Sequence, residues 1–464
     1  PLRQAISAEA LKKISSFTPK ALANTSWAFA TWGVLDDTLM AAISSASRRT
    51  MHLFNTLDLT STAWAFAALG VSDDHLMSAI AAASLRSMSD LTLQGLSNLA
   101  WAYAALDINN TPLLTSISSA SITRISSATG RADESSGAVA SIIGLVQAFT
   151  STGCLDEALF EAARAYADWH GGAMEEKMQA GKRSTLDSAE HLPGEVPSLD
   201  AARPHVLFDL KRLCVLWKPA GWTVTVSNKG NQGAAASSGP PEQAEGGLEL
   251  QAWLAREMGR LHPIALDASV SHGLLHRLDR DTSGAIVWAK SYGGYYGGLL
   301  QFAASRVSKE YVCLCQGRLP RRNVVLQAPL LEPLPGRGFA CTVMSPRGKP
   351  AYTEVTAAGH LVCLDGDVLS LAEVRIRTGR RHQIRAHFSG AGHPLLSDVG
   401  YGAARAARCP RVFLHACRLR MNSDDAALRA AVPLPPDLEG FLEHLMPLDR
   451  TSQALLEEWA EKKK

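Results

Sequence analysis

The residues best suited to chemistry lie in the second half of the chain. His276, Arg277 and Asp279 belong to the run His-Arg-Leu-Asp, which continues as Arg-Asp-Thr-Ser-Gly. A carboxylate such as Asp279 can act as a nucleophile, and a nearby cation favours the ionised state that this requires. Taken alone, the run would fit a salt-bridged turn equally well, so its meaning depends on the rest of the sequence.

A second segment supplies cations. Five arginines fall within eleven positions: Arg375, Arg377, Arg380, Arg381 and Arg385. On a strand some of them would point inward to a site and others outward, where they are natural phosphate contacts. The formal net charge of the whole chain is only +2, so this basic patch is a local feature.

Five segments of this half, taken in order, resemble the motifs of the RluA-type pseudouridine synthases. They are Lys218-Pro-Ala-Gly221, His276 to Gly284, Lys309-Glu-Tyr311, Gly348 to Thr353, and Arg377 to His387. The last is continued by Gly392-His-Pro394, Asp398, Tyr401-Gly402 and Phe413 to Ala416. The resemblance covers about residues 206–446, and His276 separates this group from a sister group acting on ribosomal RNA, which usually has Gly there.

The resemblance implies an isomerase of the intramolecular transferase class that turns uridine in RNA into pseudouridine. The reaction breaks the N1–C1′ bond, rotates the uracil and joins C5 to C1′, and it needs neither a metal nor another cofactor. Asp279 would be the catalytic nucleophile, and Arg385 would be the cation that keeps it charged. Sequence does not decide whether the carboxylate attacks C1′, attacks C6 or assists proton removal at C2′.

The family also implies roles for neighbouring residues. Tyr311 would stack on the target uracil, Ile384 would close the other side, and Arg277 would fill the gap left by the flipped nucleotide. We expect further contributions to substrate binding from four residues: His276, Arg380, Gln383 and Lys218. Of these, Lys218 is expected to hold the edge of the site.

Several single residues also allow other interpretations. Asp281 could compete for the nucleophile role, although the family has a variable residue there. The run Thr282-Ser283-Gly284 favours a turn over a catalytic serine. Neither the eight cysteines nor His382, His387, His393 and His415 have the spacing of a common zinc site. Structural histidines and reduced thiols are therefore expected.

Two positions depart from the family pattern. Trp217 precedes Lys218 where an acidic or amide residue is usual, and the segment Ser291–Leu299 carries four glycines where the family has a helix. Four glycines cost a helix about 3–4 kcal/mol relative to alanine. We therefore expect a shortened or disordered helix, which would affect the placement of Tyr311. This supports a rival interpretation, a catalytically inactive RNA-binding or scaffold protein.

The first third of the chain repeats every 37 residues. The equivalent positions are Trp27, Trp64 and Trp101; Phe29, Phe66 and Tyr103; Leu22, Leu59 and Leu96; Ile43, Ile80 and Ile117; and Gly33, Gly70 and Asp107. Each unit is expected to form two helices. In the first copy, these are one helix from Leu22 to Trp32 and a second that begins at Asp36 or Asp37. A single hairpin cannot bury its own apolar face, so stacking into an all-α solenoid is expected. A degenerate fourth copy, Gln147 to Phe160, follows an insert near residues 130–137.

These repeats, about residues 5–165, resemble the heptatricopeptide and octotricopeptide repeats, families linked to RNA binding, often in organelles. We expect the Trp and Phe columns to be core rather than platforms for base stacking. The segment has few Lys and Arg for a groove that follows phosphates. Solenoids bind proteins as readily as RNA, so the partner of this segment stays open.

Together these patterns predict a multidomain chain. The expected parts are an all-α repeat domain (1–168), a flexible linker (169–205), an α+β catalytic domain with a mixed or antiparallel sheet (206–446, including a disordered insert at 227–247) and an amphipathic tail (447–464). Strands are expected at Leu213–Trp217, Gly284–Trp288 and Tyr311–Cys315, and a helix at about Leu248–Arg260.

The expected partner is a uridine-containing ribosomal or transfer RNA, with a further RNA or protein for the repeats, and the expected state is a monomer. No stretch approaches the roughly 18 apolar residues of a membrane span. The sequence begins at Pro1, which predicts an incomplete N-terminus and leaves a targeting segment open. The repeat type favours a mitochondrion or chloroplast, with cytoplasm or nucleus as the alternatives.

Overall fold

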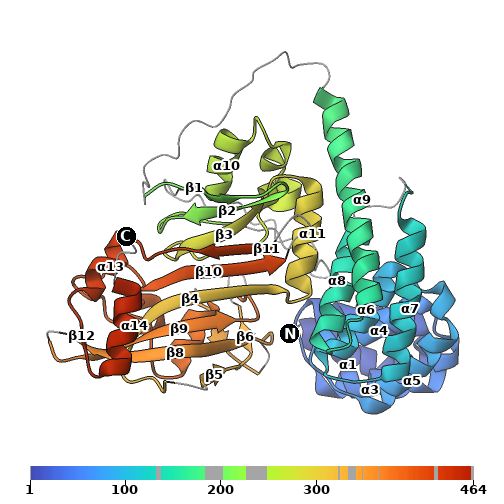
Figure 1. The fold of residues 1–464 in the computed structure, drawn as a ribbon. Helices are drawn as coiled ribbons and strands as arrows, with labels where there is room; N and C mark the ends of the chain where they lie inside the picture. Colours follow the sequence, from blue (N-terminus) through green and yellow to red (C-terminus); the bar gives the residue numbers. More distant parts are fainter. Residues whose placement is uncertain are drawn as a thin grey trace. The chain divides into compact units, whose positions relative to one another are not determined.

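The computed structural model of the protein describes residues 2–131, 137–182, 202–225, 248–321, 324–332, 341–346, 348–363, 365–422 and 427–460. The chain divides into two compact units, the first formed mainly by Pro1–Gly172 and the second mainly by residues from Ala173 onward. Figure 1 shows the helices and strands of each unit.

The first unit is all helical. Its helices are α1 (Leu2–Lys13), α2 (Pro19–Thr31), α3 (Asp37–Thr50), α4 (Thr56–Ala68), α5 (Asp74–Arg86), α6 (Leu93–Ala105), α7 (Thr111–Ala128), α8 (Gly137–Ser151) and α9 (Glu157–Lys182). Contacts link α2 to α4, α4 to α6 and α6 to α8, and they also link α1 to α3, α3 to α5 and α5 to α7. The helices therefore form two rows, while the solenoid interpretation and the domain boundaries stay predictions.

Helix ends in this unit follow from local chemistry. The Asp36 side chain accepts a hydrogen bond from the Leu39 backbone N–H at the start of α3. At the turns after α2, α4 and α6, the backbone of Gly33, Gly70 and Asp107 is left-handed, with φ of 63°, 69° and 55°. Asp107 thus adopts at the third repeat the conformation that glycine supplies at the first two.

The Trp column contradicts its expected burial, whereas the Phe column confirms it. Phe29, Phe66 and Tyr103 are almost fully buried, but Trp27 remains 46% exposed and its equivalents Trp64 and Trp101 are partly exposed. Residues two positions apart on a helix point about 200° away from each other, so one helix cannot bury both columns against the same neighbours. The rings of Trp64 and Trp101 lie 6.1 Å apart between centroids, so the column is continuous across two repeats.

Helix α9 continues into the predicted linker. It ends at Lys182 rather than before residue 169, because Ala, Met, Glu, Lys and Gln, which favour helices, outnumber Gly171 and Gly172 there. Most of the rest of that linker, and the predicted disordered insert at 227–247, lie outside the described residues. Among the helices described here, none combines the length and the apolar character needed to cross a membrane.

The second unit is built on one mixed sheet (Figure 1). Its strands are β1 (His205–Asp209), β2 (Leu213–Lys218), β3 (Ser283–Ala289), β4 (Val307–Gln316), β5 (Val324–Leu326), β8 (Thr353–Val362), β9 (Val368–Ile376), β10 (Leu414–Asn422), β11 (Ala427–Ala431) and β12 (Met446–Pro447). The main order is β1-β2-β3-β10-β4-β9-β8-β12. The pair β3–β10 is parallel and the other described pairs are antiparallel. Two short strands, β6 (Leu330–Leu331) and β7 (Val343–Met344), form a separate ribbon. The α+β class with a mixed sheet is confirmed.

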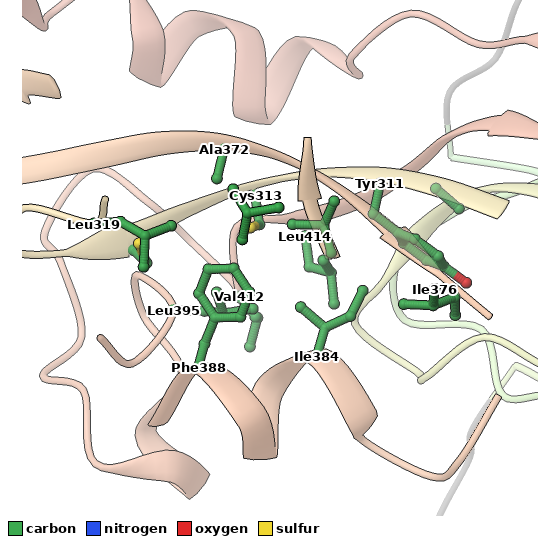
Figure 2. Packing of buried hydrophobic residues seen from close by; sticks show 14 of the residues in the cluster. Tyr311, Cys313, Leu319, Ala372, Ile376, Ile384, Phe388, Leu395, Val412 and Leu414 are labelled. Carbon is green, nitrogen blue, oxygen red and sulfur yellow. The ribbon is translucent and has the colours of Figure 1, made fainter. Parts of the chain in front are cut away.

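The two faces of the sheet carry different cores because alternate residues of each strand point to opposite sides. Tyr311 and Cys313 of β4 join a cluster with Ile384 and Phe388 of α12 (Gln383–Gly390) (Figure 2). The intervening Val312 and Leu314 belong to a second cluster, which includes residues of α13 (Pro436–Leu442) and α14 (Arg450–Ala460). The predicted C-terminal tail is thus part of the unit, with Trp459 only 9% exposed.

The glycine-rich segment forms a regular helix, contrary to the expected shortening. Helix α11 runs Tyr292–Ala303 and follows β3, while the shorter α10 (Leu250–Met258) lies at the predicted helix before the key motif. A Cβ on Gly294 would lie 2.5 Å from the carbonyl oxygen of Arg212, and one on Gly298 would lie 2.6 Å from Leu275 Cδ1. Two of the four glycines therefore let α11 pack closely, and this packing compensates for their low helix propensity.

Candidate active site

Asp279 stands on a loop whose backbone is held by a buried lysine. The Lys218 Nζ donates to the carbonyl oxygens of Pro219 at 2.8 Å, Arg280 at 3.0 Å and Thr282 at 2.7 Å. These three bonds match the three hydrogens of an ammonium group. Burial lowers the pKa of Lys218 to about 7, and the charge of Asp279 opposes that shift. Lys218 therefore holds the loop through its backbone carbonyls, which is in keeping with its expected place at the edge of the site.

Arg411 holds the same loop from another side. Its guanidinium donates to the Asp281 carbonyl and to Ser283 Oγ, both at 2.9 Å, and it pairs with Asp437 at 2.6 Å. Beyond the loop, Gly284 has φ of +127°, and a Cβ there would lie 2.3 Å from the Ala416 carbonyl oxygen. Only glycine allows β3 to meet β10 at this point, so the loop is fixed at its C-terminal end as well.

The two carboxylates of the motif have different surroundings. The side chain of Asp281 is 45% exposed and pairs with its neighbour Arg280 at the surface. That of Asp279 is 17% exposed and faces Arg385, with 3.4 Å between Oδ2 and Nη1. The geometry favours Asp279 over Asp281 as the reactive group, because only Asp279 is both sheltered and opposed by a second segment.

Arg385 is itself held by a residue to which the sequence had assigned no role. Asp398 is fully buried and accepts two hydrogen bonds from Arg385, each at 2.7 Å. Burial works to lower the pKa of Arg385, but Asp398 and then Asp279 outweigh it and raise the pKa above its usual range. The guanidinium therefore stays charged and is fixed in orientation, with the Tyr401 ring 4.9 Å from its central carbon.

His382 completes the wall beside Asp279. It is the residue before α12, and its backbone is left-handed, with φ of +53°. Its Nε2 lies 4.0 Å from Asp279 Oδ1, and its Nδ1 lies 3.1 Å from the Tyr401 hydroxyl. Burial and the charges of Arg385 and Arg381 lower the pKa of His382, while Asp279 works in the opposite direction. The sequence predicted a structural histidine here, and its spacing gave no reason to place it beside Asp279.

Tyr311 and Ile384 lie in one apolar cluster with Leu278, the residue before Asp279. Figure 2 shows Ile384 projecting from α12 toward the sheet strand that carries Tyr311. Burial raises the pKa of Tyr311, and the charge of Asp279 raises it further, so its hydroxyl stays protonated. The structure thus brings the expected uracil-holding pair close to Asp279, while their contact with a base stays a prediction.

Two residues expected to bind substrate instead use their polar groups within the protein. Gln383 donates to the Tyr352 carbonyl at 2.9 Å and to Thr353 Oγ1 at 3.0 Å, and its oxygen accepts from Thr378 and from the Arg380 N–H. His276 Nε2 accepts a hydrogen bond at 3.0 Å from the Val287 N–H. Burial lowers the pKa of His276 to about 3, so its ring is neutral. Both side chains fix the walls of the site.

The predicted arginines divide into surface and internal groups. Arg277 and Arg377 are exposed, and Arg377 lies over the Tyr352 ring at 4.7 Å. Arg380 donates to the Pro350 carbonyl at 3.1 Å, and burial lowers its pKa. Arg375 pairs with Glu310 at 3.1 Å, so its charge is already matched. Within the described part of the chain, no group of three or more His, Cys, Asp or Glu residues could hold a metal ion.

The region that carries these residues is similar to known proteins. Residues 212–390 match the family model of RNA pseudouridylate synthase. An uncharacterized RNA pseudouridine synthase of Chloroflexus aurantiacus is 36% identical over 200 residues, which cover 42% of this chain and 60% of that protein. Ribosomal large subunit pseudouridine synthase C of Pasteurella multocida is 29% identical, with 55% of this chain and 73% of that protein covered. The human RNA pseudouridylate synthase domain-containing protein 1 is 29% identical, with 45% and 72% covered.

These matches fall on the unit that carries Asp279. The C-terminal half of the chain is similar to RNA pseudouridine synthases, both to the family model and to the ribosomal large subunit synthases C and D, in line with the resemblance found in the sequence. The chain spans less than two thirds of the length of the first of these relatives.

Proposed function

We propose that the protein is an RNA pseudouridine synthase that isomerises uridine without a cofactor. The observation that carries the proposal is the sheltered Asp279 carboxylate opposed at 3.4 Å by Arg385, on a loop fixed by Lys218. A carboxylate that is sheltered, charged and immobile is what the breaking of the N1–C1′ bond requires.

The side chains around Asp279 suggest how the detached base is retained. Tyr311 and Ile384 lie in the apolar cluster next to the nucleophile, and an aromatic ring contributes about 1–3 kcal/mol by stacking on a base. Arg277 lies exposed two residues before Asp279, where it can enter the gap left by a flipped nucleotide. Flipping costs a few kcal/mol, less for a uridine in a loop or bulge.

The proposed substrate class is a structured ribosomal or transfer RNA. Similarity to ribosomal large subunit pseudouridine synthase C supports the ribosomal choice, and the exposed Arg277 and Arg377 supply phosphate contacts near the site. An organellar location is part of this proposal and rests on the type of the N-terminal repeats.

The test is conversion of uridine in RNA by the purified full-length protein, measured by nucleoside chromatography. Asp279→Asn should abolish turnover, since the amide cannot act as a nucleophile, while the exposed Asp281→Asn should retain it. Equal turnover by wild type and Asp279→Asn would refute the mechanism. No turnover by wild type on ribosomal or transfer RNA would favour the rival, an inactive binding protein.

A second proposal concerns the first unit, which we expect to bind RNA or a protein through its row of partly exposed tryptophans, Trp27, Trp64 and Trp101. Tryptophan is among the residues that most often carry binding energy at interfaces. Alanine at Trp64 and Trp101 in the full-length protein should lower RNA affinity if the row stacks on bases, and leave it unchanged if the partner is a protein. Binding would be measured by titration of labelled RNA.

A further inference from the structure

The hydrogen bonds around His382 favour one position for the proton of its neutral ring. The Tyr401 hydroxyl donates its single hydrogen to the Thr342 carbonyl oxygen at 3.0 Å. The hydroxyl can therefore only accept from His382 Nδ1, which lies 3.1 Å away. In a neutral imidazole the proton then resides on Nδ1, and the lone pair of Nε2 is directed toward the side of Asp279.

Burial of His382, more than the charges around it, favours this neutral form. The groups that act on it are Asp279 on the opposite loop, the cations Arg381 and Arg385, and Asp398 behind Arg385. Together with burial, the net result is a pKa below the usual 6.5. At neutral pH the lone pair on Nε2 is consequently available.

Two acceptors face each other across this gap. Nε2 of His382 and Oδ1 of Asp279 lie 4.0 Å apart, too far for a mutual hydrogen bond. An atom placed between them can lie about 3 Å from both, which is the distance at which proton transfer occurs. The substrate is thus the natural source of the missing donor.

The proposed isomerisation includes a proton removal that the nucleophilic role of Asp279 does not account for. When C5 of the free uracil attacks C1′, C5 holds the new bond and its original hydrogen, and C6 forms a double bond with N1. The C5–H electron pair must then restore the C5–C6 double bond, while the former C6–N1 π pair takes up a proton at N1. A base must accept the C5 proton, and an acid must return one to N1.

We propose that His382 is the base that removes the C5 proton and returns it to N1, an assignment that rests on the proposed synthase activity. Among the described titratable groups around Asp279, the others are unsuited to this step. Arg385 and Arg381 are cations without a lone pair, Lys218 has its three hydrogens bound to carbonyls, and Tyr311 stays protonated. Nε2 takes the proton from C5, and the resulting imidazolium donates it to N1, so atoms and charge balance.

The test uses full-length protein and RNA that carries hydrogen or deuterium at C5 of the target uridine. Asparagine accepts the left-handed backbone of residue 382, so His382→Asn should fold and slow turnover about 10²-fold, the lower end for loss of a general base. The ratio of the rates with hydrogen and deuterium should rise in the variant, because C5 deprotonation becomes slow. The exposed His444→Asn should match wild type in rate and in ratio.

A ratio for His382→Asn equal to that of wild type would overturn the assignment, whatever the rate, since a structural role would not act on the C5 hydrogen. If His382→Asn has no measurable turnover, His382→Gly decides. Glycine suits the left-handed backbone and leaves space, so added imidazole should restore activity, and failure of rescue overturns the proposal. If wild type itself converts no uridine, it is the proposed function that fails.

Discussion

The pair between Arg385 and Asp398 allows a quantitative prediction. Asp398 is fully buried, and Arg385 is only 16% exposed at the side chain. Two unit charges about 4 Å apart interact by about 4 kcal/mol at an effective dielectric constant of 20. Removing one partner of a buried pair costs about 3–5 kcal/mol, because the other charge is left unmatched. Asp279 remains as a second partner at 3.4 Å, so for Asp398→Asn we expect the lower value, about 3 kcal/mol.

The same substitution should also reduce turnover. Asparagine keeps one acceptor oxygen but presents an NH2 donor to the second arm of the guanidinium, so Arg385 loses its fixed orientation toward Asp279. A displacement of about 1 Å at a reacting group costs on the order of 10²-fold in rate. Pseudouridine formation should therefore fall by about that factor, while the affinity for RNA changes little.

Hydrogen exchange measures the stability loss in the right unit. Because the chain has two compact units, a global unfolding signal would mix them, whereas peptides from α12 and β4 report on the second unit alone. A loss of about 3 kcal/mol raises exchange there by about two powers of ten. Asp209→Asn is the matched control, since this carboxylate pairs with Lys290 but is 65% exposed and should change stability by less than about 1 kcal/mol. Equal effects of the two substitutions would refute the reasoning.

Other predictions concern pH, the glycine-rich helix and the loop. Burial lowers the pKa of His276 to about 3 and that of His415 to about 4. Unfolding should thus take up protons as the pH falls below about 6.5, so the urea midpoint of the second unit should decrease as the pH is lowered further. His415→Gln should make the urea midpoint less dependent on pH. An unchanged pH dependence would contradict the role given to His415. In α11, the new methyl group of Gly297→Ala enters open space and should stabilise the fold by up to about 1 kcal/mol. The methyl group of Gly298→Ala would lie 2.6 Å from Leu275 Cδ1 and should destabilise the fold by about 1–3 kcal/mol. The thermal midpoints of the two variants should therefore move in opposite directions. Lys218→Met should lower both turnover and stability, and a variant that retains wild-type turnover would show that the three carbonyl contacts do not position Asp279.

Local pattern predicted several of the elements. Short apolar runs bounded by turns predicted β2, β3 and β4, and an Asp after a glycine turn predicted the start of α3. Asp279, Arg385, Tyr311 and Ile384 were found through motifs, and the structure brings the first two within 3.4 Å and the other two into one cluster. Their catalytic roles stay predictions.

What the sequence could not reveal depends on contacts between distant segments. Lys218 reaches carbonyls 62 and 64 residues further along the chain, and Arg411 reaches one 130 residues back. Asp398 belongs to the last motif in the sequence, but only its buried contact with Arg385 shows that it orients the guanidinium. The glycines of α11 suggested a shortened or disordered helix, because helix propensity describes an isolated helix. The close packing of Leu275 against Gly298 is visible only in the fold.

The loop that carries Asp279 is bound on several sides, by Lys218, by Arg411 and by the glycine contact with β10. A catalytic group on such a loop cannot travel toward its target. For the proposed reaction, the nucleotide must do all of the moving. Discrimination among uridines would then depend on how easily the RNA lets each nucleotide leave its stack. Uridines in flexible loops would be modified quickly and those in stable helices rarely, even when the surrounding sequence is the same. The rate of modification at each uridine would then report the free-energy cost of extruding that nucleotide.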